Sequence, residues 1–199
     1  SSQQCHQVHA VLASLFDVLP AQQLAQAKLY RAQCKHPEDT YQTRLALLDA
    51  VTPSPQLQQQ QWQTKASIYE ALFDARSALD AHIKSQDYDI EHVWQLAQKI
   101  PAEQLVLSGI PEIDGFISLT KIVREHALNQ YELASQLTQF QYQFPNHSLV
   151  RNLPAQIIGL LSIRNNTAQR VAVLLPLTGR LAAQAQQIKQ GVVSAYLAG

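Results

Sequence analysis

Prolines end a series of short apolar stripes in this chain, and this repetition constrains the fold more than any other feature. Val8, Leu12 and Leu15 lie twelve, eight and five residues before Pro20. The same offsets recur before three later prolines, and in part before a fourth: Pro37, Pro53, Pro145 and Pro101. Offsets of three and four place each set on one face of a helix, and proline stops a helix because it lacks the amide hydrogen. Most of the chain is therefore predicted to be a series of amphipathic helices.

The spacing of the first three of these prolines indicates how the helices are arranged. Steps of 17 and 16 residues, from Pro20 through Pro37 to Pro53, give 33 residues per pair of helices. Tetratricopeptide (TPR) repeats have a period of ~34 residues, but the signature Trp, Gly and Tyr positions of those repeats are not met. We expect an all-α fold built as a TPR-like stack of antiparallel helix pairs, with an irregular helical bundle as the alternative.

The same periodicity predicts the later helices at 56–72, 74–85, 89–99, 112–127 and 130–143. Asp89 and Asn129 are suitable N-caps, and Pro111 suits a first helical turn. Four aromatic residues recur at helical spacing and are expected in the core: Trp62, Tyr69, Phe73 and Trp94. Residues 146–168 are predicted to form one more helix, which packs the helical part onto the next domain.

The last thirty residues follow a different pattern. Residues 171–175 are apolar without alternation, which is typical of a strand in a parallel sheet that is covered on both faces. A turn of Pro176, Leu177, Thr178 and Gly179 follows, and then an Ala/Gln-rich helix. A parallel sheet needs several strands, so we expect a helical domain over 1–165, and over 166–199 a linker with only the first βα unit of a second domain.

The composition excludes some classes of function. Lys plus Arg and Asp plus Glu number 15 each, so the net charge is zero, and charged residues make up only 15% of the chain. A protein that binds nucleic acid neutralises phosphates with a basic surface, which this chain lacks. No stretch approaches the ~20 apolar residues of a membrane span, and no signal peptide is present, so we expect a processed chain.

The two cysteines are placed so that they can meet. If the first two helices form a hairpin that turns near Pro20, Cys5 and Cys34 lie at the same height on neighbouring helices. In an oxidising compartment they could form a disulfide that stabilises the fold by ~3 kcal/mol through chain entropy. Helix axes usually lie 8–10 Å apart, farther than disulfide geometry favours. Both alternatives, a disulfide and two free thiols, therefore stay open.

Other candidate sites have simpler explanations. A Cys2His2 metal site could combine the two cysteines with two of the three histidines His6, His9 and His36, but these spacings match no zinc finger. Glu112 and Asp114 form a carboxylate pair of the kind glycosidases use, yet acidic residues in a first helical turn favour the helix dipole. His82, His92 and His126 are expected to be satisfied within the fold or by solvent. We therefore predict no catalytic residues, no metal and no cofactor.

The end of the chain resembles the opening of a type I periplasmic-binding-protein fold. The residues that carry the resemblance are Val171–Gly179 followed by Ala182, Ile188, Gly191 and Ala195. In that fold the first strand delivers a Pro-Leu-Ser/Thr-Gly turn to the cleft between the lobes, so Pro176, Leu177, Thr178 and Gly179 are the cleft turn that the resemblance implies. Ala185 departs from the family pattern, which often has glycine there.

A helical front joined directly to this fold resembles the LpoA family, outer-membrane lipoproteins of Gammaproteobacteria that activate a bifunctional class A penicillin-binding protein. The junction carries the resemblance: Phe144-Pro145-Asn146-His147, the helix from Leu153-Pro154 to Leu161, and then the strand. It implies a non-enzymatic protein on the periplasmic side of the outer membrane, lipid-anchored upstream of residue 1. Its partners would be the class A synthase and, as a second candidate, peptidoglycan, with the helical domain acting as a scaffold or spacer.

Two other functions compete with this one. A solute-binding protein with a helical extension would share the second domain. A lytic transglycosylase could place its catalytic lobe on a helical superhelix, but the Glu-Ser pair that this class needs occurs nowhere in the chain. The sequence identifies no partner-binding residues.

Overall fold

The computed structural model describes Cys5, Gln7 and residues 11–12, 14–34, 39–52, 54–162 and 172–198. For residues 196–198 it describes the backbone alone. The chain divides into two compact units, Ser1–Ile163 and Arg164–Gly199. Several predicted features lie outside the described residues: Val8, His6, His9, His36, Pro37, Pro53 and the segment 163–171.

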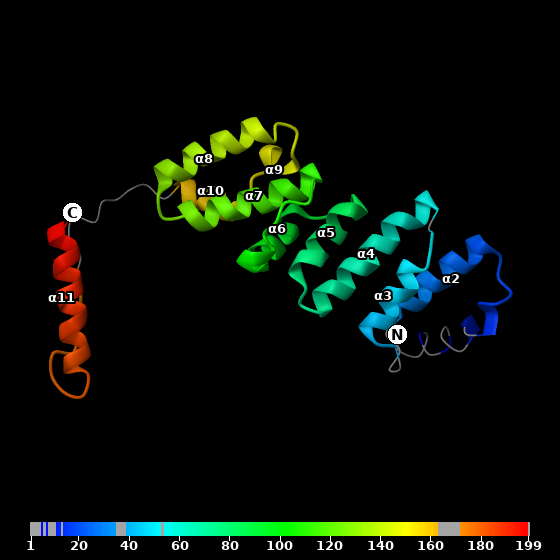
Figure 1. Cartoon of the computed structure of the whole chain (residues 1–199), viewed down its shortest axis with the longest axis horizontal. Helices are drawn as coiled ribbons and strands as arrows, with labels where there is room; N and C mark the ends of the chain where they lie inside the picture. The colour runs from blue at the N-terminus through cyan, green and yellow to red at the C-terminus, as the bar shows by residue number, and fades with distance from the viewer. Residues whose placement is uncertain are drawn as a thin grey trace. The chain divides into compact units, whose positions relative to one another are not determined.

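The first unit is built from helices (Figure 1). They are α2 (Ala21–Gln33), α3 (Tyr41–Asp49), α4 (Pro55–Ala71), α5 (Ala75–Ser85), α6 (Ile90–Lys99), the 3-10 turn η1 (Ala102–Gln104), α7 (Pro111–His126), α8 (Gln130–Gln143), α9 (Ser148–Arg151) and α10 (Ala155–Ser162). Within the described ranges no residue belongs to a strand. The predicted all-α class is confirmed for this unit, and α4 to α8 begin and end within one residue of their predicted positions.

Short polar side chains begin several of these helices. Asp89 accepts a hydrogen bond from the backbone N–H of His92, and Asn129 accepts one from the N–H of Glu132. Pro111 stands at the first turn of α7. These three predictions are confirmed, and they follow from the need to satisfy the first free N–H groups of a helix.

The turn between α4 and α5 has no glycine or proline to mark it. Phe73 makes the turn with a φ of 59°, in the left-handed region, and Asp74 then caps α5 by accepting from the N–H of Ser77. Phe73 is 95% exposed, so the prediction that it belongs to the core is wrong. Its position beyond the end of α4 and its positive φ turn the ring away from the packed face. Trp94 is buried as predicted, and its indole N–H donates to Gln156.

The helices pack mainly against their neighbours in the chain, and α4 with α5 is the most extensive pair. Figure 1 shows α2 to α6 following one another along the unit, with α7 and α8 as the next pair. A small core of Leu29, Ala32, Leu48 and Ile68 joins α2, α3 and α4. The larger core extends from α5 to α10, and α7 contacts α5, α6, α8 and α9. The helix α7 is therefore central to this core.

The prediction of one continuous helix over 146–168 is wrong. The structure has two short helices, α9 and α10, separated by residues 152–154. Pro154 explains the break, since it has no N–H to donate and disfavours helical geometry at Leu153. Within α10, Ile157 is buried against the larger core.

In the second unit, residues 172–177 have no regular secondary structure, and α11 covers Ala182–Ala198. The strand predicted at 171–175 is therefore not formed here, with Val171 outside the described residues. A strand is defined by ladder hydrogen bonds to a neighbouring strand, and the described part of this unit offers none. The helix predicted after the turn is present.

Candidate functional site

The turn Pro176–Gly179 is separated by two residues from α11, which begins at Ala182. Gly179 has a φ of +81°, a conformation that glycine adopts without steric cost, and its carbonyl accepts from the N–H of Ala182 at 3.2 Å. The turn residues are exposed. A cavity of about 310 Å³ is lined by both segments of the unit: Val173, Leu174, Leu175, Leu177, Lys189, Val192 and Val193. Residues 173–175 and Leu177 therefore lie against α11.

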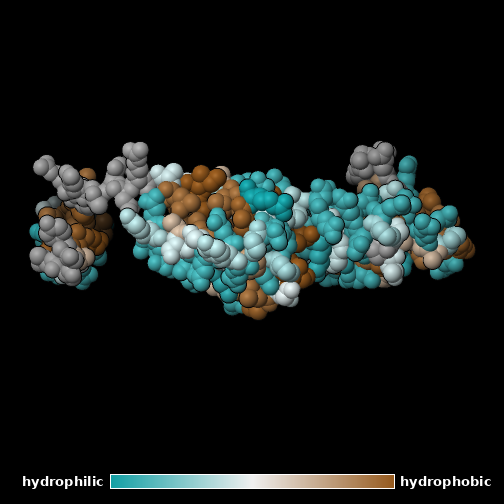
Figure 2. Space-filling model, turned by 90° about the horizontal axis from the view of Figure 1, so that it is seen from above, coloured by the Kyte–Doolittle hydropathy of each residue, from teal (hydrophilic) through white to brown (hydrophobic). Residues whose placement is uncertain are grey.

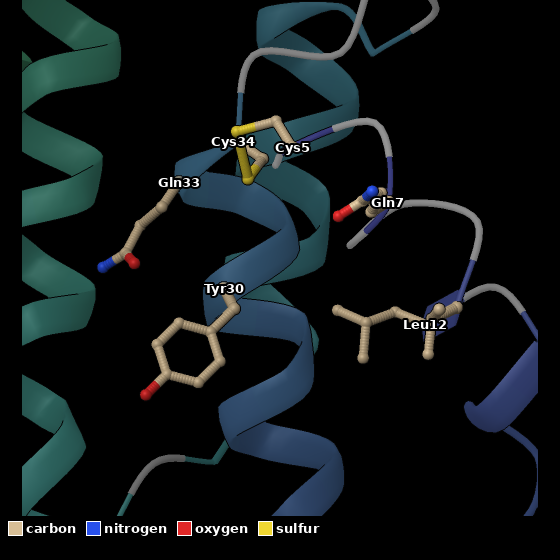
Figure 3. A pocket seen from close by; sticks show the side chains of 7 residues that line it. Cys5, Gln7, Leu12, Tyr30, Gln33 and Cys34 are labelled. Atoms are coloured by element: carbon tan, nitrogen blue, oxygen red, sulfur yellow. A yellow bond between two sulfur atoms is a disulfide. The ribbon is translucent and has the colours of Figure 1, made fainter. Parts of the chain in front are cut away.

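Cys5 and Cys34 form a disulfide in the structure, with their Cα atoms 5.2 Å apart (Figure 3). Cys34 directly follows the last residue of α2, and Figure 3 shows Tyr30 on the same helix about one turn away. A mostly apolar cavity adjoins the bond, lined by Cys5, Gln7, Val11, Leu12, Tyr30, Gln33 and Cys34. The disulfide thus ties the start of the chain to the end of α2.

The carboxylates of Glu112 and Asp114, at the start of α7, both accept hydrogen bonds from other residues of the protein. Glu112 accepts a hydrogen bond from the Tyr88 hydroxyl at 2.6 Å. Burial alone would raise the pKa of Glu112, but hydrogen bonds from Ser148 and Tyr88 outweigh it and lower that pKa. Burial, together with the hydrogen bond to Glu112, raises the pKa of Tyr88 to about 12.

Asp114 holds the loop that precedes α7. Its carboxylate accepts from the N–H and hydroxyl of Ser108 and from the N–H of Gly109, at 2.6, 2.9 and 3.0 Å. Asp114 is 9% exposed. Both carboxylates therefore position neighbouring segments of the protein, as expected for acidic residues at a helix start.

A third cluster, which the sequence did not reveal, joins three consecutive helices. The Nε2 atoms of His82 and His92 lie 2.6 Å and 3.1 Å from the same carboxylate oxygen of Glu70. Burial tends to raise the pKa of Glu70, but hydrogen bonds from the two histidines, His82 first, lower it overall. No spacing in the sequence signals this cluster, because it depends on how the connections after α4 and α5 orient the helices.

Exposed apolar side chains occur at several places on the surface of the first unit. Figure 2 shows a largely hydrophilic face with several separate hydrophobic patches, one of them at the end where α8 and α10 lie. Leu128 and Ile158 are among the exposed apolar side chains there. None of the helices described is both long enough and apolar enough to cross a membrane.

Comparisons with known proteins agree on one group of relatives. The penicillin-binding protein activator LpoA of Vibrio cholerae serotype O1 is 31% identical over 193 residues, covering 89% of this chain and 32% of that protein. The protein of the same name from Histophilus somni is 24% identical over 199 residues, covering 93% of this chain and 34% of that protein. The chain thus spans about a third of the length of these relatives.

Solved structures share the fold. Full-length LpoA from Haemophilus influenzae matches with a TM-score of 0.59 at 20% identity, over 94% of this chain and 38% of that one. The LpoA N-terminal domain from the same organism matches with a TM-score of 0.51 at 16% identity, over 79% of this chain and 94% of that one. At these identities the likeness shows the fold alone. The family model described as "LppC putative lipoprotein" matches residues 1–199. The chain therefore belongs to the LppC lipoprotein family, whose relatives matched here carry the name LpoA.

Proposed function

We propose that this chain is the N-terminal part of a non-enzymatic periplasmic lipoprotein that activates peptidoglycan synthesis by binding a bifunctional class A penicillin-binding protein. The lipid anchor would lie upstream of residue 1 and hold the protein on the periplasmic side of the outer membrane. The observation that carries the proposal is the family match over all 199 residues, together with relatives that are named penicillin-binding protein activators.

The helical unit would act as a TPR-like scaffold or spacer over residues 1–165. Its helices pack mostly against their neighbours in the chain, which is how repeat proteins build an extended surface. The two candidate carboxylates form hydrogen bonds within the helical unit, which supports a role without catalysis. Glu112 accepts a hydrogen bond from Tyr88, and Asp114 holds the loop before α7 through Ser108 and Gly109.

The segment 166–199 would be the linker and opening βα unit of a periplasmic-binding-protein-like domain, with Pro176–Gly179 as its cleft turn. Exposed apolar side chains, both before α11 and within it, support this assignment. Val173, Leu174, Ile188 and Val192 are between 43% and 97% exposed. Neighbouring strands and a second helix layer would bury such side chains, as in other sheets with helices on both faces.

Binding to purified proteins tests the proposal. The full-length protein, immobilised through its N-terminus, is expected to retain a class A penicillin-binding protein and not a monofunctional transpeptidase used as the control. Equal retention of both, or of neither, would contradict the proposed partnership. Adding soluble peptidoglycan fragments to the same surface tests the second candidate partner.

Two further readouts address the competing functions. A zymogram on murein gels is expected to show no clearing, whereas a cleared band would favour a lytic transglycosylase. Amino acids and sugars are expected to leave the melting temperature of the full-length protein unchanged, whereas a rise would favour a solute-binding protein.

A further inference from the structure

The cluster of Glu70, His82 and His92 has the composition of a metal site. Each residue comes from a different helix, α4, α5 and α6 in turn, and offers one ligand atom. These three atoms all lie within 4.8 Å of one another. Two imidazole nitrogens and one carboxylate oxygen are a common ligand set for Zn²⁺ when a water molecule completes a tetrahedral site. Imidazole favours Zn²⁺ over Mg²⁺ and Ca²⁺, which prefer oxygen ligands.

The distances are close to those that a zinc ion requires. Ligand atoms bonded to one tetrahedral zinc at ~2.0–2.1 Å lie about 3.3 Å from each other. The two nitrogen–oxygen distances here are 2.6 Å and 3.1 Å, so each nitrogen needs to move from the shared oxygen by less than an ångström. All three ligand atoms lie within 4.8 Å of one another. Each histidine now places Nε2 against a carboxylate oxygen. On metal binding the ring proton resides on Nδ1, and the Nε2 lone pair binds the ion.

The cluster is accessible to an ion from solution. The side chains of His82, Glu70 and His92 are 17%, 33% and 44% exposed. Glu70 also lines a cavity of about 260 Å³, whose described lining includes neither histidine. The positively charged Lys99 lines the same cavity and would weaken the affinity for a cation. The two imidazole rings meet edge to face with centroids 5.1 Å apart, so they already converge on the shared oxygen.

We propose that Glu70, His82 and His92 bind one Zn²⁺ ion that links α4, α5 and α6, with water as the fourth ligand. The ion would fix the relative positions of three consecutive helices at the middle of the first unit. This inference does not rest on the proposed function, because it needs no partner and no second domain.

Calorimetric titration of the metal-free chain with Zn²⁺ tests the proposal. One ion is expected to bind per chain with a dissociation constant in the micromolar range or below. His92→Gln and Glu70→Gln are each expected to weaken binding by about tenfold or more, because each removes a ligand. His126→Gln is the matched control. His126 also lies beside a glutamate, Glu125 at 3.8 Å, on a different helix, so its replacement is expected to leave the affinity unchanged.

A second readout separates this site from other histidines. Co²⁺ in place of Zn²⁺ is expected to give the visible absorption bands of a tetrahedral ion in the wild-type chain and in His126→Gln, and to lose them in His92→Gln. His92 is the most exposed of the three ligands, so its variant is the least at risk of unfolding, and circular dichroism checks its fold. Binding that is equally tight in His92→Gln, or an absence of saturable binding to the wild type, would overturn the proposal.

Discussion

Replacing Gly115 with alanine is expected to destabilise the helical unit by about 3 kcal/mol. Gly115 lies inside α7, and a β-carbon added there would overlap the imidazole ring of His147, whose Nε2, Cδ2 and Cε1 atoms would all be too close. The ring is held in place by burial and by two hydrogen bonds. It is part of a residue only 4% exposed, Nε2 lies 2.8 Å from the carbonyl oxygen of Glu112, and Nδ1 accepts from the N–H of Leu149.

Aromatic packing further fixes this ring. His147 lies edge to face against Phe116, Phe140 and Phe144, with centroids 5.5–6.0 Å apart. The overlap can therefore be relieved only by breaking the two hydrogen bonds or by separating α7 from the segment that begins α9. Either change disturbs the larger core, in which α7 is the central helix.

Urea unfolding followed by circular dichroism measures the effect, with Gly159→Ala as the matched control. Gly159 lies in the helix α10, is exposed, and has no atom within 4 Å of the position a β-carbon would take. Alanine there is expected to raise the free energy of unfolding by up to ~1 kcal/mol, because glycine is the weaker helix former. A Gly115→Ala protein as stable as the wild type would show that the close approach of His147 is not as described.

Loss of the Cys5–Cys34 disulfide is the second large effect that we expect. The bond closes a loop with a sequence separation of 29 residues. Chain entropy alone assigns such a loop a stabilisation of about 3–4 kcal/mol. The loss should be concentrated at the α2–α3 end of the unit, where the small core contains only four buried residues. Neither Cys5 nor Cys34 belongs to the larger core, which extends from α5 to α10.

Thermal melting with and without reductant measures this effect. The wild-type chain is expected to melt several degrees lower when reduced, and the Cys5→Ser/Cys34→Ser double variant should melt at that lower temperature in both conditions. The double variant is thus the control for any effect of the reductant itself. If oxidised and reduced wild-type chains unfold at the same temperature, the bond contributes nothing to stability.

Helices with both a repeating apolar face and a terminal signal could be predicted well. Asp89 before α6 and Asn129 before α8 mark helix starts chemically, and the apolar stripes fix the rest, so these helices begin and end where expected. The apolar stripes predict the break between α4 and α5, but not the left-handed conformation of Phe73, since no residue type there indicates it. Pro154, by contrast, did carry a signal, and it divides the region predicted as one helix.

Sites formed by several helices were harder to predict than the helices themselves. Whether Cys5 and Cys34 meet depends on the direction of two side chains, which spacing alone left undecided. The approach of His82 and His92 to Glu70 depends on the connections after α4 and after α5. No single residue in the sequence indicates the geometry of these two connections. The resemblance to the LpoA family, in contrast, rested on the junction after Phe144, and the family match and the named relatives confirm it.

The rate of peptidoglycan synthesis by a purified class A penicillin-binding protein tests the central claim most directly. The rate is measured at a fixed enzyme concentration while the full-length protein is added in increasing amounts. The proposed activator role predicts a saturable rise in the rate, and no rise with an equal amount of an unrelated helical protein. A rate that stays constant up to saturating concentrations of the full-length protein would contradict the account.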